Sequence, residues 1–422
     1  MLYKLYVRLV INMHKNIITV VGMTILFLGT CITPTYAIDN PIKPISSGNT
    51  LYVGGSGEGN YTSIQDAIDN ASIGDTVFVY DDSSPYYEEL QINKTINLIG
   101  EDKHTTVIDA QHEDDTVNIS VADNCLVSGF TIQNCHWSGT EYSHAVVSII
   151  RSDYVIIKDN ILTIGDTSAI DWTCAVELDN CTYCTVQDNI MSEDDYKKRT
   201  VGVSLHEGSS YNTISGNDIS TYTIGVETFV LNYNLFDSNN YNIISGNHIH
   251  HNLIGIQILG DTNNEILNNR IEYNEAEGIR NAEAHNTTIS GNIISYNGIG
   301  REFDCGIKLT FETKNNYISD NVISNNNPTG IYMLTGVRNV VTRNNLVDNW
   351  GKSGTPERWW GNAFFNYELS QWRLFRLNCW RRNYWSGHSG ILPKAIHGVY
   401  WLIFEIPWFE FDWLPALNSY DL

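Results

Sequence analysis

Basic residues are scarce in this chain: Lys and Arg together number 25 against 48 Asp and Glu, which gives a formal net charge of −23. A chain this acidic repels phosphate backbones, which argues against a nucleic-acid partner. Charged residues of either sign make up 17%, below the roughly 25% typical of globular proteins, and uncharged polar residues, above all Asn, take their place. Hydrophobic residues still make up 42%, which excludes general disorder.

Long apolar runs are missing after residue 37. The one such run, Ile17 to Ile32, follows Lys4, Arg8 and Lys15 and precedes a small-residue site that ends at Ala37. This order is typical of an export signal, so we expect residues 1–37 to be a signal peptide and the protein to be extracytoplasmic, either secreted or on the cell surface. Because the run spans 16 residues, an uncleaved membrane anchor is the alternative, and we expect membrane contact through that anchor alone.

Cysteines do not predict a disulfide framework, because 7 of the 8 follow residue 37, an odd number with uneven spacing. Cys174, Cys181 and Cys184 leave two interpretations open. Cys-x2-Cys is half of a thiolate metal site, whereas small buried side chains need no further partner. The pattern lacks a second cysteine pair, so we favour buried filling residues.

An internal repeat organises the chain from about Val127 to Leu346. Each repeat has a strand that begins Gly-Ile-x-apolar, a polar loop and then apolar-x-x-Asn-x-apolar, and successive repeats are 22 to 30 residues apart. This period, with strand-like alternation and no helical period, predicts a solenoid of about nine or ten stacked coils over residues 50–349. A leucine-rich repeat is disfavoured because regular Leu positions are missing. The aligned Asn residues are Asn160, Asn189, Asn217, Asn247, Asn269, Asn292, Asn321 and Asn344.

The repeated Asn has a structural explanation. Asn tolerates left-handed backbone conformations, and its amide both donates and accepts, so stacked copies form a hydrogen-bonded ladder inside a bend. Apolar residues on either side of each Asn, such as Ile214 and Ile219, are expected to fill the interior. In the preceding coil Phe130 takes the Asn position.

The two ends of the solenoid need caps, because a stack of strands leaves open edges. Thr62 or Ser63 is a candidate N-cap for a helix that would cover the first coil with Ile64, Ala67 and Ile68. Nine of the 11 Trp residues fall at or after Trp350, which predicts an apolar C-terminal cap over residues 350–422. An aromatic platform for sugar stacking is the alternative.

Several segments resemble a known superfamily. Tyr61-Thr-Ser-Ile-Gln-Asp-Ala-Ile, Gly74-Asp-Thr-Val-Phe-Val, Asn383-Tyr-Trp-Ser and Phe411-Asp-Trp-Leu-Pro-Ala are similar to the right-handed parallel β-helix proteins of the pectin-lyase-like superfamily, in particular its NosD-type, carbohydrate-binding and sugar-hydrolysis (CASH) branch. The resemblance covers roughly Thr50 to Ala416 and implies an all-β, right-handed parallel β-helix. Relatives in that branch are associated with copper-site maturation and with glycan degradation.

The chain departs from the active enzymes of that superfamily. It lacks the Asn-Thr-Asp, Asp-Asp and Gly-His-Gly series of polygalacturonases and the Arg-x-Pro-x-x-Arg of pectate lyases. The resemblance therefore implies a fold and a link to carbohydrate, and it leaves turnover open.

The x residue of Gly-Ile-x-apolar is expected to point outward, one residue per coil, about 4.8 Å apart. An extended sugar polymer laid across the coils would meet these side chains in turn. Glu177, Glu227 and the nearby His206 are the candidate catalytic residues, with the two carboxylates two coils, roughly 10 Å, apart, slightly more than the roughly 6.5–9.5 Å of inverting glycosidases. An ordinary solvated sheet face is the alternative. The candidate substrate-binding residues are Ser204, Gln257, Arg280, Lys308 and Tyr332.

A second cluster is Asn247-His248-Ile249-His250-His251. His248 and His250 share a strand face, so they are candidate ligands for copper or zinc. Their expected neighbours are Asp218, Arg270 and Glu272, and the Arg270 charge would oppose a cation. The acidic runs at residues 113–115 and 193–195 are candidates for loose calcium binding or for solvated turns, and no cofactor is firmly implied.

These patterns favour a β-helix that binds extracellular or cell-envelope carbohydrate along its outward face. The acidic net charge favours neutral or mixed glycans over polyuronates, unless Arg280 and Lys308 hold a uronate or sulfate. A polysaccharide hydrolase or lyase and a copper-accessory protein are the alternatives.

Overall fold

The computed structural model of the protein describes residues 48–111, 114–135, 144–165, 172–193, 199–229, 238–299, 304–349, 362–368, 378–388, 392–401 and 405–422. The chain divides into two compact units, Met1–Lys43 and Pro44–Leu422, and the described residues belong to the second. The expected signal segment and Trp350, Trp359, Trp360 and Trp372 lie outside the described residues. Within those ranges, no helix has the length and hydrophobicity that crossing a membrane requires.

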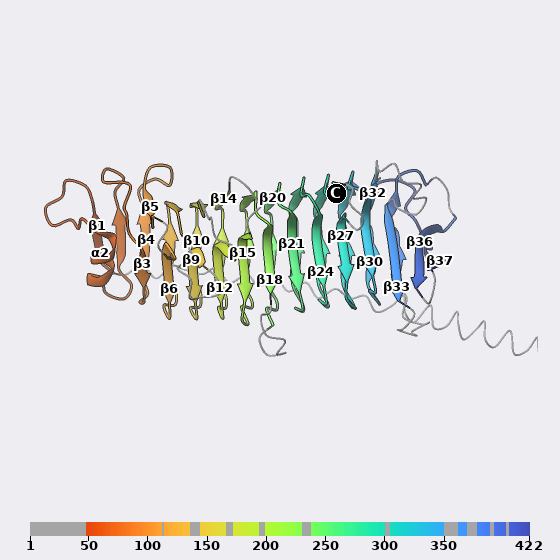
Figure 1. Cartoon of the computed structure of the whole chain (residues 1–422), viewed down its shortest axis with the longest axis horizontal. Coiled ribbons are helices and arrows are strands. Elements are labelled where there is room, and N and C mark those ends of the chain that lie inside the picture. The colour runs from red at the N-terminus through yellow and green to blue at the C-terminus, as the bar shows by residue number, and fades with distance from the viewer. Residues whose placement is uncertain are drawn as a thin grey trace, which may run out of the picture. The chain divides into compact units, whose positions relative to one another are not determined.

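Parallel strands stack along three faces of a coiled chain, because from β2 onward most strands pair with the strand three places later in the sequence (Figure 1). On face A, a typical strand buries its central apolar residue and leaves the flanking residues partly exposed, as the two-residue period of a strand requires. The strands of face A are β1 (Thr50–Val53), β2 (Thr76–Val79), β4 (Asn97–Gly100), β7 (Leu126–Ser128), β10 (Ile156–Lys158), β13 (Thr185–Gln187), β16 (Thr213–Ser215), β19 (Ile243–Ser245), β22 (Glu265–Leu267), β25 (Thr288–Ser290), β28 (Tyr317–Ser319), β31 (Val340–Thr342) and β34 (Cys379–Arg381).

Face B has the longer strands, most of which carry the Gly-Ile-x phrase or its equivalent. The last of them pairs antiparallel with β37 (Glu405–Asp412), which also contacts β34, so faces A and B join there into one sheet of 26 strands. The strands of face B are β3 (Leu90–Ile92), β6 (Val117–Ser120), β9 (His144–Ile150), β12 (Thr173–Asp179), β15 (Thr200–His206), β18 (Ile224–Phe229), β21 (Ile254–Leu259), β24 (Glu277–Ala282), β27 (Cys305–Thr310), β30 (Thr329–Leu334), β33 (Ala363–Glu368) and β36 (Lys394–Trp401).

Face C is a separate sheet of 11 strands, which gives eleven coils instead of the nine or ten expected. The count differs because the coils at both ends depart from the repeated phrase. The strands of face C are β5 (Val107–Asp109), β8 (Thr131–Gln133), β11 (Ile161–Thr163), β14 (Ile190–Ser192), β17 (Asp218–Ser220), β20 (His248–His250), β23 (Arg270–Glu272), β26 (Ile293–Ser295), β29 (Val322–Ser324), β32 (Asn345–Val347) and β35 (Tyr384–Trp385).

The interior of the coil is apolar, as the repeat predicts. Fully burying one such side chain contributes about 1.5–3 kcal/mol, so a column of them stabilises every coil against its neighbours. The predicted interior residues with 0% exposure are Ile214, Ile219, Ile244, Ile249, Ile266, Ile271, Ile289, Ile294, Ile318, Ile323, Val341 and Leu346.

The predicted amide ladder is present at the corner between faces A and C. Each Nδ2 donates to the Oδ1 of the next Asn at 2.9–3.2 Å. The backbone explanation needs a correction, because the left-handed residue precedes the ladder Asn, as at Gly216 and Gly246 with φ of 67° and 66°. The ladder joins Asn160, Asn189, Asn217, Asn247, Asn269, Asn292, Asn321, Asn344 and Asn383.

Shorter amide ladders line the other two corners. Asn252 donates to Asn274 at 3.1 Å at the corner between faces C and B, and Asn316 donates to Asn339 at 2.9 Å between faces B and A. These Asn residues lie five positions after or before an Asn of the first ladder. That offset is visible in the sequence, and it would have predicted both.

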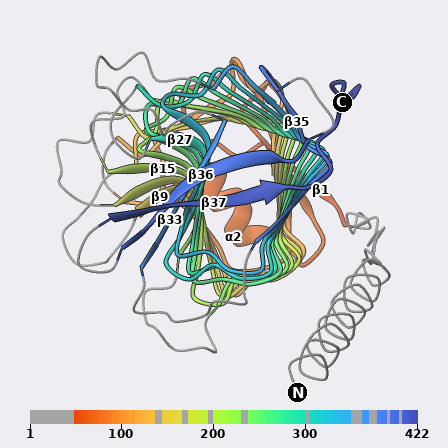
Figure 2. The ribbon, with the colours of Figure 1, turned by 90° about the vertical axis from the view of Figure 1, so that its right-hand side faces the viewer.

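The two ends of the coil are closed differently (Figure 2). Helix α2 (Ile64–Asn70) covers the first coil with Ile64, Ala67 and Ile68, and Ser63 is its N-cap. At the other end, the β36–β37 hairpin crosses the coil. The buried indoles of Trp380 and Trp385 donate to Glu410 at 2.6 Å and to Asp412 at 3.1 Å, respectively.

Candidate functional site

The Gly-Ile-x residues form one row across face B, which we call the outer row. Strand pairing aligns Glu177 with Ser204, Ser204 with Glu227 and Glu227 with Gln257. The same register continues to the end of the predicted series, so the expected alignment is confirmed. The full outer row is Glu177, Ser204, Glu227, Gln257, Arg280, Lys308 and Tyr332.

The expectation of a row open to solvent is wrong for more than half of it. Glu177 is 4% exposed, Ser204 is 2% exposed, and Glu227 and Tyr332 are fully buried. Arg280 and Lys308 keep 32% and 16% of their side-chain surface, so the accessible part of the row is its middle. Sequence periodicity places a residue on a face, and it does not reveal what covers that face.

Glu227 is a buried carboxyl group with two donors on one oxygen. Its Oε1 accepts from Trp172 Nε1 at 2.9 Å and from Ser204 Oγ at 3.1 Å, while Oε2 has no hydrogen-bond partner among the described residues. Burial raises the pKa of Glu227 to about 7, because the two hydrogen bonds only partly offset the loss of water. Near neutral pH this group is able to hold or to release a proton.

His206 is bonded to the neighbouring acid of the row. It is 8% exposed, and its Nε2 lies 2.5 Å from Glu177 Oε1, so it is not part of a solvated sheet face. Burial alone lowers the pKa of His206, but the hydrogen bond and the charge of Glu177 outweigh it and the pKa is raised. Glu177 and His206 therefore act as a pair, with Ser204 between them and Glu227.

The accessible middle of the row is a cationic cluster around one acid. Glu277 accepts from Arg280 at 2.7 Å and from Lys308 at 2.6 Å, and Arg280 also donates to Gln257 at 3.1 Å. Two positive charges against one negative charge leave a local excess of one. Sequence reasoning missed Glu277, although it begins the same strand as Arg280, three positions earlier.

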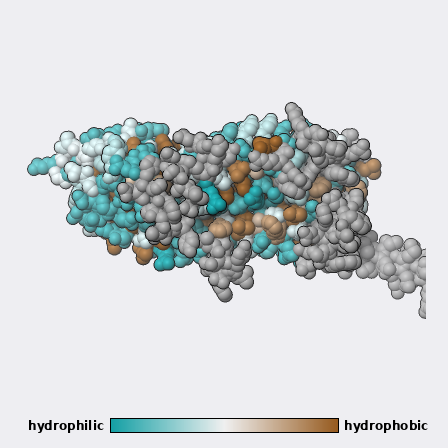
Figure 3. Space-filling view, viewed as in Figure 1, coloured by the Kyte–Doolittle hydropathy of each residue, from teal (hydrophilic) through white to brown (hydrophobic). Residues whose placement is uncertain are grey.

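An apolar strip lies beside the outer row on face B, and Trp172 and Leu253 pack against it. Figure 3 shows hydrophilic and hydrophobic side chains next to one another over β21, β24 and β27. Tyr332 stacks on Phe364 with centroids 5.9 Å apart and lies in a small buried cluster, so its position is that of a packing residue. The apolar strip contains Ala145, Cys174, Val201, Ile224, Ile254 and Ala276.

The three clustered cysteines do not converge. Cys174 belongs to the apolar strip outside the coil, whereas Cys181 and Cys184 lie in the interior core. The thiols of Cys181 and Cys184 contact backbone carbonyl oxygens at 3.1 and 3.3 Å, and all three cysteines are free and buried. The structure supports the interpretation as filling residues.

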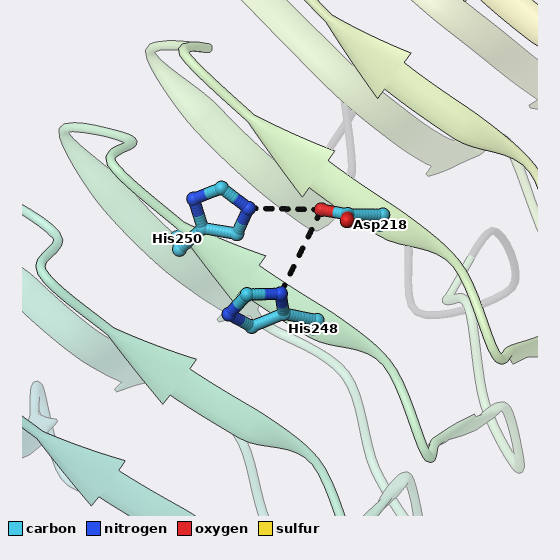
Figure 4. Close-up of side chains that lie close together, drawn as sticks. All are labelled: Asp218, His248 and His250. Atoms are coloured by element: carbon cyan, nitrogen blue, oxygen red, sulfur yellow. Dashed lines mark hydrogen bonds and ion pairs between the residues drawn. The ribbon is translucent and has the colours of Figure 1, made fainter.

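The histidine cluster lies on face C. Figure 4 shows Asp218, His248 and His250 close together. Strand pairing aligns His248 with Asp218 on one side and with Arg270 on the other, as predicted, and places His250 beside Glu272. A second group of possible ligands, Asp114, Asp115 and His144, includes two residues of the expected calcium run. Glu113, Asp194 and Asp195 lie outside the described residues.

Comparison with known proteins supports the fold. The family described as "Right handed beta helix region" matches residues 232–362. No curated protein is matched by the sequence.

Solved structures with a similar fold act on or bind carbohydrate according to their names. The A-module of mannuronan C-5 epimerase AlgE6 from Azotobacter vinelandii is 15% identical, with a TM-score of 0.50 over 72% of this chain and 92% of that one. The tailspike protein of E. coli bacteriophage HK620 in complex with a pentasaccharide is 13% identical, with a TM-score of 0.54 over 78% and 65% of the two chains. A GH87 α-1,3-glucanase catalytic domain in complex with tetrasaccharides is 15% identical, with a TM-score of 0.51 over 84% and 66%.

The chain therefore spans just under two thirds of the tailspike and glucanase chains. Sequence identities of 13–15% show that the folds are similar, and they do not extend to function. The protein is an all-β, right-handed parallel β-helix with a helix at one end and a Trp-rich cap at the other.

Proposed function

We propose that the protein is a secreted or cell-surface β-helix that binds carbohydrate across the middle of face B. The observation that carries this proposal is the placement of Gln257, Arg280 and Lys308 on successive strands, with polar side chains that remain partly exposed. Sugars present hydroxyl groups along their edges, so polar donors and acceptors on successive coils suit an extended glycan. Secretion rests on the sequence pattern of residues 1–37.

The charge of the middle row favours neutral or weakly acidic glycans. Arg280 and Lys308 both bond Glu277, so a ligand meets two cations that are already partly neutralised. A polyuronate would also meet the repulsion of a chain with a net charge of −23. Solved β-helices of similar fold in complex with oligosaccharides support this class of ligand.

A glycan array probed with the full chain tests the proposal. Binding of an oligosaccharide is expected, and Arg280→Gln should weaken it at least tenfold, about 1.4 kcal/mol. Arg343→Gln is the matched control, because Arg343 also pairs with one acid, Asp320, but lies between faces A and C and not on face B. Binding that survives Arg280→Gln and Lys308→Gln, or equal losses in the control, would contradict the proposal.

A polysaccharide hydrolase is the second candidate, and the pKa of Glu227 favours it. A carboxyl group with a pKa of about 7 suits a general acid, and Glu177 lies two coils away with His206 beside it. Both carboxyl groups are buried, so turnover requires that a substrate reach them through the residues that cover this end of the outer row. A reducing-end assay separates the two functions, because binding alone creates no new ends. If turnover occurs, Glu227→Gln should lower it at least 100-fold, whereas Glu265→Gln on face A should not.

A further inference from the structure

Three side chains with metal-ligating atoms meet on face C, away from the proposed carbohydrate site. Asp218 comes from β17, and His248 and His250 come from β20 on the next coil (Figure 4). The ligand atoms of all three lie within 4.8 Å of one another. Asp218 Oδ1 is 2.8 Å from His250 Nε2 and 3.8 Å from His248 Nδ1.

Glu272 fixes the ring orientation of His248 through the ring nitrogen that does not face Asp218. Its Nε2 lies 3.1 Å from Glu272 Oε1, and a carboxylate only accepts, so Nε2 carries the proton and the Nδ1 lone pair faces Asp218. A carboxylate behind a ligating histidine is the arrangement that orients ligands in metal sites. Glu272 itself has 8% of its side chain exposed and is held by Arg270 at 2.7 Å.

Arg270 does not oppose a cation in the way that the sequence suggested. Its Nε is bonded to Glu272 and its side chain is 60% exposed, so the guanidinium serves the supporting carboxylate. The carboxylate of Glu272 compensates the positive charge of Arg270 locally. The objection to a metal site is therefore removed by the geometry.

His250 has a second partner of its own. Its Nε2–H donates to Asp218 Oδ1 at 2.8 Å, because a carboxylate only accepts, and its Nδ1 accepts from His251 Nδ1–H at 2.7 Å. An ion bound at the site would take the place of the Nε2 proton.

We infer that Asp218 Oδ1, His248 Nδ1 and His250 Nε2 bind one divalent first-row transition ion. Two imidazoles and one carboxylate suit ions such as Zn²⁺ and Cu²⁺ better than Ca²⁺ or Mg²⁺. Ligand atoms about 2.1 Å from an ion lie roughly 3.0–3.4 Å apart, so small rotations of the side chains bring the observed 2.8 and 3.8 Å into range. Three protein ligands leave at least one position for water or another molecule.

The test is calorimetric titration of the tag-free full chain with ZnCl₂ and, separately, CuCl₂. One ion per chain is expected at this site. Asp218→Asn and the double variant His248→Ala/His250→Ala should each weaken that binding at least 100-fold, and Glu272→Gln, which loses only the supporting carboxylate, should weaken it 10- to 100-fold. Cu²⁺ bound to the wild type should give an electron paramagnetic resonance spectrum with coupling to imidazole nitrogen that the double variant lacks.

His144→Ala is the matched control, because His144 also lies beside two acids, Asp114 and Asp115. The affinity of the face C site should be unchanged in it. The inference is overturned if the wild type binds neither ion, if the double variant keeps the affinity within threefold, or if His144→Ala removes the binding instead. All three proposed ligands are partly exposed, so the melting temperature of the metal-free variants should stay near that of the wild type.

Discussion

Trp172 donates its indole N–H to Glu227 over 2.9 Å, although the two residues are 55 positions apart in the chain. The contact joins the residue before β12 to the outer row two strands farther along face B. The protonation of Glu227 therefore depends on a residue outside the repeat.

Replacing Trp172 by Phe should raise the pKa of Glu227 further above about 7, because the hydrogen bond from the indole favours the charged carboxylate. The loss of one bond to a buried group should also lower the free energy of unfolding by about 1–3 kcal/mol. Nuclear magnetic resonance titration of labelled Glu carboxyl carbons measures the first effect. Trp413→Phe, at an exposed indole, should change neither quantity.

Relative to the wild type, Glu227→Gln should have a higher free energy of unfolding at alkaline pH than at acid pH. The pKa of Glu227 rises from 4.5 in the unfolded chain to about 7 in the fold, so ionisation opposes folding, and this destabilisation grows from about pH 4.5 to about pH 7. Its full size is on the order of 3 kcal/mol. In thermal unfolding at pH 5 and pH 8, the melting temperature of the variant relative to that of the wild type should be higher at pH 8. An equal difference at both values would contradict the burial argument.

Asn269→Ala should cost about 2–4 kcal/mol of unfolding free energy, because it removes a donor and an acceptor that are both buried. Its Nδ2 donates to Asn292 and to Ile244 O, and its Oδ1 accepts from Asn247. Urea unfolding measures the loss. Asn418→Ala, at an exposed Asn near the C-terminus, is the control and should lie within about 0.5 kcal/mol of the wild type.

Glu277→Gln should shift glycan preference toward acidic sugars. The change raises the local charge around Arg280 and Lys308 from +1 to +2 while keeping the shape of the side chain. Binding of a uronate-containing oligosaccharide should strengthen at least threefold and become more sensitive to salt. A neutral glycan bound at the same site should change less, and equal changes for both would argue against a direct electrostatic effect.

The stacking of the coils could be predicted because it depends on spacing. The Asn column fixed the register, and from it followed the outer row and the neighbours of His248, down to Asp218 and Arg270. The two shorter ladders are predictable in the same way, because their Asn residues lie five positions before or after those of the first ladder. Periodic features of the sequence thus translate directly into contacts between coils.

Burial and local pairing could not be predicted, because they depend on residues outside the repeat and on side-chain conformation. Trp172 contacts Glu227 from the segment that precedes β12, and His206 is buried in a hydrogen bond with Glu177. The direction of Arg270, toward the Glu272 oxygen that also contacts His248, is likewise a matter of rotamer. The strand register determines which residues are neighbours, but it does not determine which hydrogen bonds their side chains form.

The amide ladders at three corners have a consequence for how such a chain changes in length. Where the ladders run, each coil offers its neighbours the same bonds in the same places, so duplication or loss of one such turn leaves the remaining junctions chemically intact. Insertions that are not whole turns are tolerated in the loops between strands, where no ladder residue is displaced. The molecule can therefore be lengthened or trimmed in units of one coil, while its loops diversify independently.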